Sequence, residues 1–274
     1  MFAHKGVRWI TLGWTAFITE NVVLSHNREW IIDKFGEKNY HGLYNILSSA
    51  ACLSIAYGYF KHGRNMGPIL NPKYWKPNSI PFRITAFSFQ SIGLIGFSQN
   101  FPKLQNPIVT SMNSTTHQTD TLTSNINTNN NSNIKQEKKR KIQFAAQCPV
   151  DWHPADIPSD GIYGLKRVTR HPMLFSLGSF GLGIALKTQF ATRAIVCGFP
   201  MLFALIGGFH QDYRHRRHSG KYLSPEIDEK TSLIPFIALI KGKQSWNDLW
   251  NELKHVNMSI ALLTSIYLNI SVAI

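Results

Sequence analysis

Residues 42–60 read GLYNILSSAACLSIAYGYF, a stretch without any charged side chain. A membrane-spanning helix needs about 20 mostly apolar residues, so this stretch has the length and composition of a span. Its many Ser, Ala and Gly residues are of the size that lets membrane helices approach closely. Tyr57, Tyr59 and Phe60 at its end are typical of the aromatic belt at a membrane surface. The stretch therefore favours an integral membrane protein.

Further apolar stretches flank this one on both sides. The weakest contains Glu20 and Asn21 in its second half, and the last is moderately apolar and almost uncharged. The stretches span residues 7–25, 82–98, 173–186, 191–209 and 256–274. The short polar break between the third and fourth of these predicts an antiparallel helical hairpin. The sequence thus predicts an all-α, multi-pass transmembrane bundle of about five or six helices.

A polar insert separates the apolar stretches into two groups. Residues 110–143 consist almost entirely of Asn, Thr, Ser and charged residues. Such a composition cannot bury enough apolar surface to offset the entropy of the chain, so we expect disorder there. The predicted organisation is a first half of a membrane domain at residues 1–103, a largely disordered insert at 104–150, and a second half at 151–274.

The charge balance is strongly basic, with 29 Lys and Arg against 15 Asp and Glu and a net charge of +14. Basic residues stand mainly between the apolar stretches, as Lys61, Lys166 and Arg214 do. This placement favours contact with membrane lipids and argues against a nucleic-acid partner. The positive loops fall on both sides of an alternating topology, so they leave the orientation undecided. The three cysteines form no close pair, which excludes a disulfide framework and a Cys-only metal site.

Residues 161–188, GIYGLKRVTRHPMLFSLGSFGLGIALKT, carry the most informative motif. Pro172 precedes an apolar stretch and fits the first turn of a helix, where its missing N–H costs nothing. His171, as the residue before proline, is predicted at the helix cap, where the helix dipole favours the neutral ring. A neutral imidazole can bind a metal or haem iron. Arg170 can pair with an anionic group or reach lipid headgroups, and a simple interface anchor is the competing interpretation.

Two other histidines stand at the ends of apolar stretches. His26 follows the first stretch, close to the buried-looking Glu20 and Asn21, and polar residues within a span usually face the bundle interior. His210 ends the stretch at 191–209 and begins the polar patch HQDYRHRRHSGKY. The patch lacks Cys and has Asp212 as its one carboxylate, which disfavours zinc. P-loop, Rossmann and nucleophile-elbow patterns are absent, so the sequence does not support soluble hydrolase or kinase chemistry.

These segments together resemble the NnrU family, which includes 15-cis-ζ-carotene isomerases of plants and cyanobacteria. The similarity rests on the pattern G-x-x-x-x-x-R-x-T-R-H-P at residues 161–172, followed by an apolar stretch. It also rests on the first stretch ending in His26, on YHGLYNILSSAACLSIAYGYF, and on the closing segment TSLIPFIALIKGKQ at 231–244. The resemblance covers most of the chain outside residues 104–150, and the insert is not part of the family pattern.

The resemblance implies an all-helical membrane protein that binds haem b between its helices. It implies His26 and His171 as the axial ligands of the iron, and it assigns no catalytic residue. If these two histidines lie at opposite membrane faces, His210 is the alternative ligand and the next candidate partner for His171. The chemistry that it implies is redox-gated cis–trans isomerisation of an apolar polyene such as ζ-carotene, with an electron donor that the sequence does not identify. We expect His26 and His171 to lie at the same membrane face and to line one cavity.

Two alternatives stay open. A non-enzymatic haem- or partner-binding membrane protein linked to nitrogen-oxide metabolism is suggested by bacterial members of the family. Met173 follows R-H-P where the isomerases carry a polar residue. An isoprenylcysteine-type membrane methyltransferase, using S-adenosylmethionine, also carries R-H-P before a membrane helix, but the basic stretch at 212–222 differs from its Glu-rich segment. The host membrane, whether of a plastid or a mitochondrion, cannot be read from the sequence.

Overall fold

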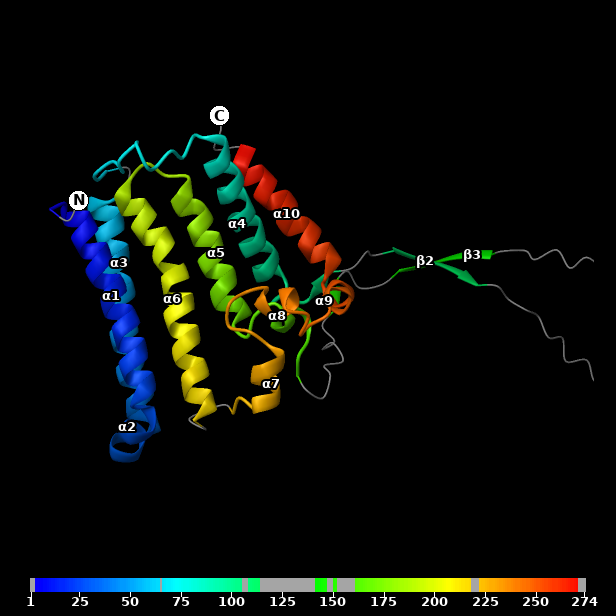
Figure 1. The fold of residues 1–274 in the computed structure, drawn as a ribbon, viewed down its shortest axis with the longest axis horizontal. Coiled ribbons are helices and arrows are strands. Elements are labelled where there is room, and N and C mark those ends of the chain that lie inside the picture. The colour runs from blue at the N-terminus through cyan, green and yellow to red at the C-terminus, as the bar shows by residue number, and fades with distance from the viewer. Residues whose placement is uncertain are drawn as a thin grey trace, which may run out of the picture. The chain divides into compact units, whose positions relative to one another are not determined.

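The chain divides into two units, residues Met1–Lys103 with His153–Ile274 and residues Leu104–Trp152. The computed structural model describes residues 3–64, 66–104, 108–113, 141–146, 150–151, 161–217 and 222–270. The described residues of the first unit, apart from Lys103 at the start of a short strand, form helices and the segments that join them (Figure 1). Its long helices are α1 (Lys5–His26), α3 (Glu37–His62), α4 (Ile80–Ser98), α5 (Pro172–Leu186), α6 (Ala191–Arg216) and α10 (His255–Ile270). Its short helices are α2 (Arg28–Phe35), α7 (Pro225–Lys230), α8 (Ile237–Ile240), α9 (Trp246–Glu252) and the 3₁₀ helix η1 (Gly164–Arg167).

The long helices pack as neighbours in the order α3, α1, α6, α5, α4 and α10. Each predicted apolar stretch forms one of them, and the hairpin expected around residues 187–190 joins α5 to α6. Close crossings depend on glycine, because a Cβ at Gly181 would overlap the carbonyl oxygen of Cys197. A Cβ at Gly93 would likewise overlap the backbone of Phe180. Small residues therefore bring α6 and α4 against the two sides of α5.

Many buried positions in this unit are polar and many large apolar side chains are exposed, which is unusual for a water-soluble protein. Small and polar side chains occupy the helix contacts: Ser91 and Ser265 share a hydrogen bond of 2.9 Å, and Thr192 is fully buried. Large apolar side chains point outward, as Ile46 and Leu53 do, each with 69% of its surface exposed. An apolar solvent around the helices would satisfy this arrangement.

Two of the described helices, α4 and α6, are long and apolar enough to cross a membrane. Helix α5 is apolar but has 15 residues. Helix α1 contains Arg8, Glu20 and Asn21, and α10 has 16 described residues. The prediction of an all-helical bundle is therefore confirmed for the first unit, whereas five or six membrane spans are not confirmed by length and composition.

The second unit contains β-structure. Strand β2 (Ile108–Asn113) pairs antiparallel with β3 (Lys141–Ala146), with Ile108 opposite Ala146 and Asn113 opposite Lys141. Two further strands have two residues each, β1 (Lys103–Leu104) and β4 (Val150–Asp151). Regular structure thus occurs at both ends of the stretch 110–143, where disorder was expected. The β-branched Ile108, Val109 and Thr110 favour one strand, and Ile142 and Phe144 favour the other. The prediction of disorder at residues 114–140 lies outside the described residues.

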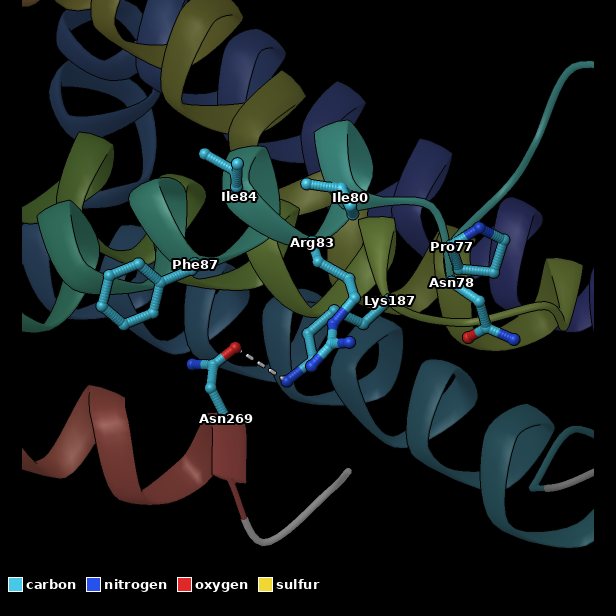
Figure 2. Close-up of a pocket in the computed structure, with 8 residues that line it drawn as sticks. All are labelled: Pro77, Asn78, Ile80, Arg83, Ile84, Phe87, Lys187 and Asn269. Atoms are coloured by element: carbon cyan, nitrogen blue, oxygen red, sulfur yellow. Dashed lines mark hydrogen bonds between the residues drawn. The ribbon is translucent and has the colours of Figure 1, made fainter. Parts of the chain in front are cut away.

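Among the cavities between the described helices of the first unit are the following three. One of about 640 Å³ opens where α4 begins and where α5 and α10 end (Figure 2). A second, of about 540 Å³, lies between α4, α5 and α6 and has an almost wholly apolar lining. A third, of about 270 Å³, lies between α1, α3 and α6. The first is at one end of the unit, and the third is near the opposite end.

Candidate functional site on the two faces of helix α6

The R-H-P segment forms the entrance to α5. Pro172 is the first residue of the helix, and His171 precedes it with a non-helical backbone (φ −121°, ψ 62°). The predicted cap position is therefore confirmed. The turn before it depends on glycine, because Gly161 and Gly164 have φ values of 67° and 55°. This geometry fixes the side chains of residues 170 and 171 beside the end of α6.

Asp212 of α6 is the centre of a charged network. The guanidinium of Arg170 donates to Oδ2 of Asp212 from Nη2 at 2.6 Å and from Nε at 2.9 Å. Nε2 of His171 lies 2.8 Å from Oδ1 of the same carboxylate. The Asp212 side chain is 3% exposed and those of Arg170 and His171 are 11% and 10% exposed. A buried carboxylate is stable here because a cation and a ring N–H neutralise and satisfy it.

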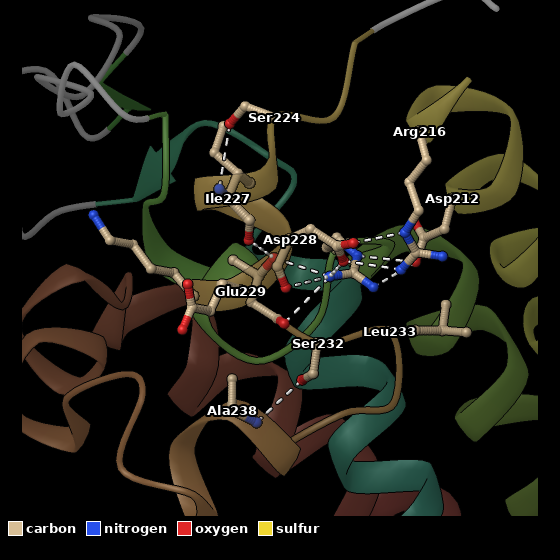
Figure 3. Close-up of polar contacts among 12 residues, drawn as sticks. Asp212, Arg216, Ser224, Ile227, Asp228, Glu229, Ser232, Leu233 and Ala238 are labelled. Carbon is tan, nitrogen blue, oxygen red and sulfur yellow. Dashed lines mark hydrogen bonds and ion pairs between the residues drawn. The ribbon is translucent and has the colours of Figure 1, made fainter. Parts of the chain in front are cut away.

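A second carboxylate extends this network to α7 (Figure 3). Oδ1 of Asp228 lies 2.8 Å from Nη1 of Arg170, and Nε of Arg216 lies 2.6 Å from Oδ2 of Asp228. Nη1 of Arg170 also donates to the carbonyl oxygen of Thr231 at 3.2 Å. The hydrogen bond from Arg216 holds the pKa of Asp228 below its usual range. Arg170 therefore pairs with anionic groups that the protein itself supplies, Asp212 and Asp228.

A pair of histidines lies at the opposite face of α6, with His210 on α6 itself and His26 at the end of α1. The rings of His26 and His210 have centroids 5.9 Å apart, and Tyr213 stacks on His26 with centroids 6.4 Å apart. Nε2 of His210 is buried and has no hydrogen-bond partner in the described part of the chain. The cavity of about 270 Å³ adjoins this ring and is lined also by Asn21, Tyr40, Tyr44 and Gln211, among others. The pair therefore places an imidazole nitrogen that lacks a partner beside a polar cavity.

Helix geometry explains why the structure does not bring His26 and His171 together. His171 contacts α6 at Gly208, where a Cβ would lie 3.2 Å from its ring, and at Asp212 one turn later. His210 is two residues from each, so its side chain projects from nearly the opposite side of the helix. His26 and His171 lie at the same end of the unit, as expected. The last residues of α1 and the first residues of α5 are both at this end. However, α6 lies between them, so they do not line the common cavity predicted from the sequence.

Polar residues of α1 and α3 form a network beside the His210 cavity. Tyr44 donates its hydroxyl hydrogen to Oδ1 of Asn21, and Ser48 donates to Oε1 of Glu20. Asn21 in turn donates to the same Glu20 oxygen at 2.9 Å. Glu20 and Asn21 therefore face the interior of the helical bundle. This agrees with the expectation that polar groups in an apolar helix avoid an apolar environment.

Sequence reasoning missed the partners Tyr44 and Ser48 and the central role of Asp212. The signal for Asp212 was available, because it is the one carboxylate within a basic patch of residues 210–222. A single acid among so many cations is a natural partner for them. Its particular partners could not be predicted, because Arg170 and His171 are 42 and 41 positions away in the chain.

The packed long helices place this chain in the class of helical-bundle proteins. A family model described as NnrU protein matches residues 9–270, nearly the whole chain. The chain belongs to the NnrU family. No curated protein and no solved structure matches the chain.

Proposed function

We propose that this NnrU-family protein is a multi-pass membrane protein that binds haem b between α1 and α6. Insertion into a bilayer is supported by the outward-facing Ile and Leu side chains of α1, α3, α4 and α10, such as Leu12, Ile84 and Leu263. In water these surfaces would be large exposed apolar patches, whereas lipid chains cover them without cost. Alkaline extraction of membranes tests this proposal: the protein should remain in the membrane pellet, and release into the supernatant would contradict it.

The observation that carries the haem proposal is the pairing of His26 with His210. Two imidazoles that hold one metal ion at metal–nitrogen distances of about 2 Å would have ring centroids roughly 6 Å apart. The observed 5.9 Å has this spacing, and the buried Nε2 of His210 lacks another partner among the described residues. The donor set therefore fits a haem iron. His171 is separated from His26 by α6, and its Nε2 lies 2.8 Å from Asp212, which leaves only Nδ1 for a metal.

The cavity beside His210 fits only part of a tetrapyrrole. Its volume of about 270 Å³ is close to the lower limit of roughly 300 Å³ for small-molecule sites. Entry of a whole macrocycle would require α1 to move relative to α6. When bound, haem would supply one-electron redox chemistry. His26 and His210 would hold the iron, and Tyr213 would fix the orientation of the His26 ring by stacking.

Absorption spectra of the detergent-purified protein, loaded with haem, test the ligand assignment. The wild-type protein should show a Soret band with low-spin features, and His26→Ala and His210→Ala should each lose the low-spin features. His171→Ala should retain them. His62→Ala is the matched control, because His62 ends α3 at the opposite end of the unit. Loss of the low-spin spectrum in His171→Ala together with its retention in His210→Ala would contradict the assignment.

The apolar cavity of about 540 Å³ favours a second candidate function, isomerisation of an apolar polyene such as ζ-carotene. Its lining includes Phe89, Phe175 and Leu205, and its polar surface is small. Thr169 and Pro172 of the R-H-P segment line the same cavity. Incubation of the reduced, haem-loaded protein with a 15-cis polyene, followed by chromatography of the isomers, tests this function. Binding without conversion would favour the non-enzymatic alternative, and S-adenosylmethionine binding without a Soret band would favour a methyltransferase.

A further inference from the structure

The end of the first unit where α1, α4 and α6 begin has positive charges and, among its described residues, no carboxylate. We call it the acid-free end. Its cations are Lys5, Arg8, Lys61, Arg64, Lys73, Lys76, Arg83, Lys187 and Arg193. The ion pairs of the described residues lie at the other end, as between Arg167 and Glu252 or between Arg216 and Asp228. The positive charge of the acid-free end is therefore not neutralised by the described part of the protein.

Two of these cations, Arg83 and Lys187, line the cavity of about 640 Å³. Figure 2 shows their side chains next to each other, with Asn269 of α10 facing them. Nζ of Lys187 donates to Oδ1 of Asn269 at 3.0 Å, and Asn269 donates to Gln90 of α4 at 3.0 Å. The amide of Asn269 thus holds the ammonium of Lys187 at the cavity from a neighbouring helix.

The electrostatics of this cavity are repulsive in the absence of an anion. The pKa of Lys187 is lowered by burial of the ammonium and further by the positive charges of Arg193 and Arg83. Lys187, Arg83 and Arg193 form no ion pair with a described residue. Arg83 and Arg193 are exposed, whereas Lys187 is partly buried. A phosphate group between Arg83 and Lys187 would remove the repulsion, because guanidinium and ammonium groups both donate to phosphate oxygens.

The same cavity has an apolar wall. Ile80, Ile84 and Phe87 of α4 line it, and Ile80 and Ile84 have 72% and 61% of their surfaces exposed. The apolar wall continues along α4, one of the two helices with the length and composition of a span. A ligand that matches both parts has an anionic head and an apolar chain.

We propose that this cavity binds the phosphate-bearing head of one anionic phospholipid between Arg83 and Lys187, with an acyl chain along Ile84 and Phe87. The inference rests on the proposed insertion into a membrane and does not depend on haem. A lipid held here would join α4, α5 and α10 at the acid-free end and stabilise their packing.

The test uses the full-length protein purified in a neutral detergent, with dioleoylphosphatidylglycerol, dioleoylphosphatidylcholine or inorganic phosphate as the added probe. Native mass spectrometry counts bound lipid, and thermal unfolding measures stabilisation. We expect one phosphatidylglycerol to bind and to raise the unfolding temperature more than phosphatidylcholine or phosphate does. The variant Arg83→Gln/Lys187→Gln should bind it with affinity reduced roughly tenfold or more, because each basic group near an anionic head contributes about 1 kcal/mol.

The matched control is Lys73→Gln/Lys76→Gln, which removes the same charge from exposed residues of the acid-free end outside the cavity. It should keep the wild-type affinity. Equal affinity of both double variants, or equal binding of phosphatidylcholine, would overturn the proposal, and full stabilisation by inorganic phosphate would overturn the lipid assignment. If the cavity variant does not fold, Arg83→Gln alone provides the test at an exposed position. The Soret band and alkaline extraction report separately on the proposed haem binding and membrane insertion.

Discussion

The positively charged residues at the two ends of the helical unit have different surroundings. At the end that contains the R-H-P segment, Arg170 and Arg216 form short ion pairs with buried or partly buried carboxylates of α6 and α7. At the acid-free end, Arg83 and Lys187 face a cavity and have no ion pair with a described residue. The same residue types therefore stabilise tertiary structure at one end and are available to a ligand at the other. Charge counts alone could not separate these roles.

Removal of Asp212 should give the largest effect on stability. Asp212→Ala leaves Arg170 and His171 buried without their shared partner, and breaking a buried pair in this way costs about 3–5 kcal/mol. Asp248→Ala is the control, since that carboxylate is 50% exposed and 3.8 Å from Arg167, and it should cost less than about 1 kcal/mol. Unfolding of both variants in detergent, followed by circular dichroism, measures the difference. Equal stability of the two would contradict a structural role for the R-H-P network.

The pH dependence of stability should reveal the second carboxylate of the network. The folded-state pKa of Asp228 is lowered, chiefly by the hydrogen bond from Arg216, so its ionised form stabilises the fold. This contribution is complete above the unfolded value of about 3.8 and is lost as the pH falls through the lower folded value. Asp228→Asn should therefore unfold at a lower temperature than wild type at neutral pH, and the difference should disappear in acid. A difference that stays constant across this range would show that ionisation of Asp228 is not involved.

Loss of charge at the acid-free end should have the smallest effect when lipid is absent. Arg83→Gln/Lys187→Gln breaks no ion pair between described residues. It loses the hydrogen bond from Lys187 to Asn269, which is offset by the removal of mutual repulsion. Its stability in neutral detergent should lie within about 0.5 kcal/mol of wild type or slightly above it. Arg170→Gln, at the other end, should be strongly destabilising under the same conditions. A large loss of stability in the cavity variant would mean that its cations are already neutralised by anionic partners in the protein, and the contrast between the two ends would fail.

Part of the site could be predicted from local sequence. Pro172 restricts its own backbone and that of His171. The start of α5 could therefore be predicted from the local sequence. The sequence also predicted that Glu20 and Asn21 face the interior of the bundle, because polar groups are costly within an apolar helix. The pairing of His26 with His210, by contrast, requires the rotation of α6 about its axis relative to α1. That rotation is set by the contacts of Phe17 with Phe203 and of Trp14 with Phe199, which local patterns do not specify.

The sequence by itself determined the positions of the long helices and the separation of the chain by a polar insert, because apolar periodicity, chain length and proline act locally. Only the tertiary structure decided which face of α6 meets which histidine. Since α5 packs on one face and α1 on the other, His171 meets Asp212 while His26 meets His210. It also decided which cations are neutralised, because the partners of Arg170 are far away in the chain and reach it only through helix packing.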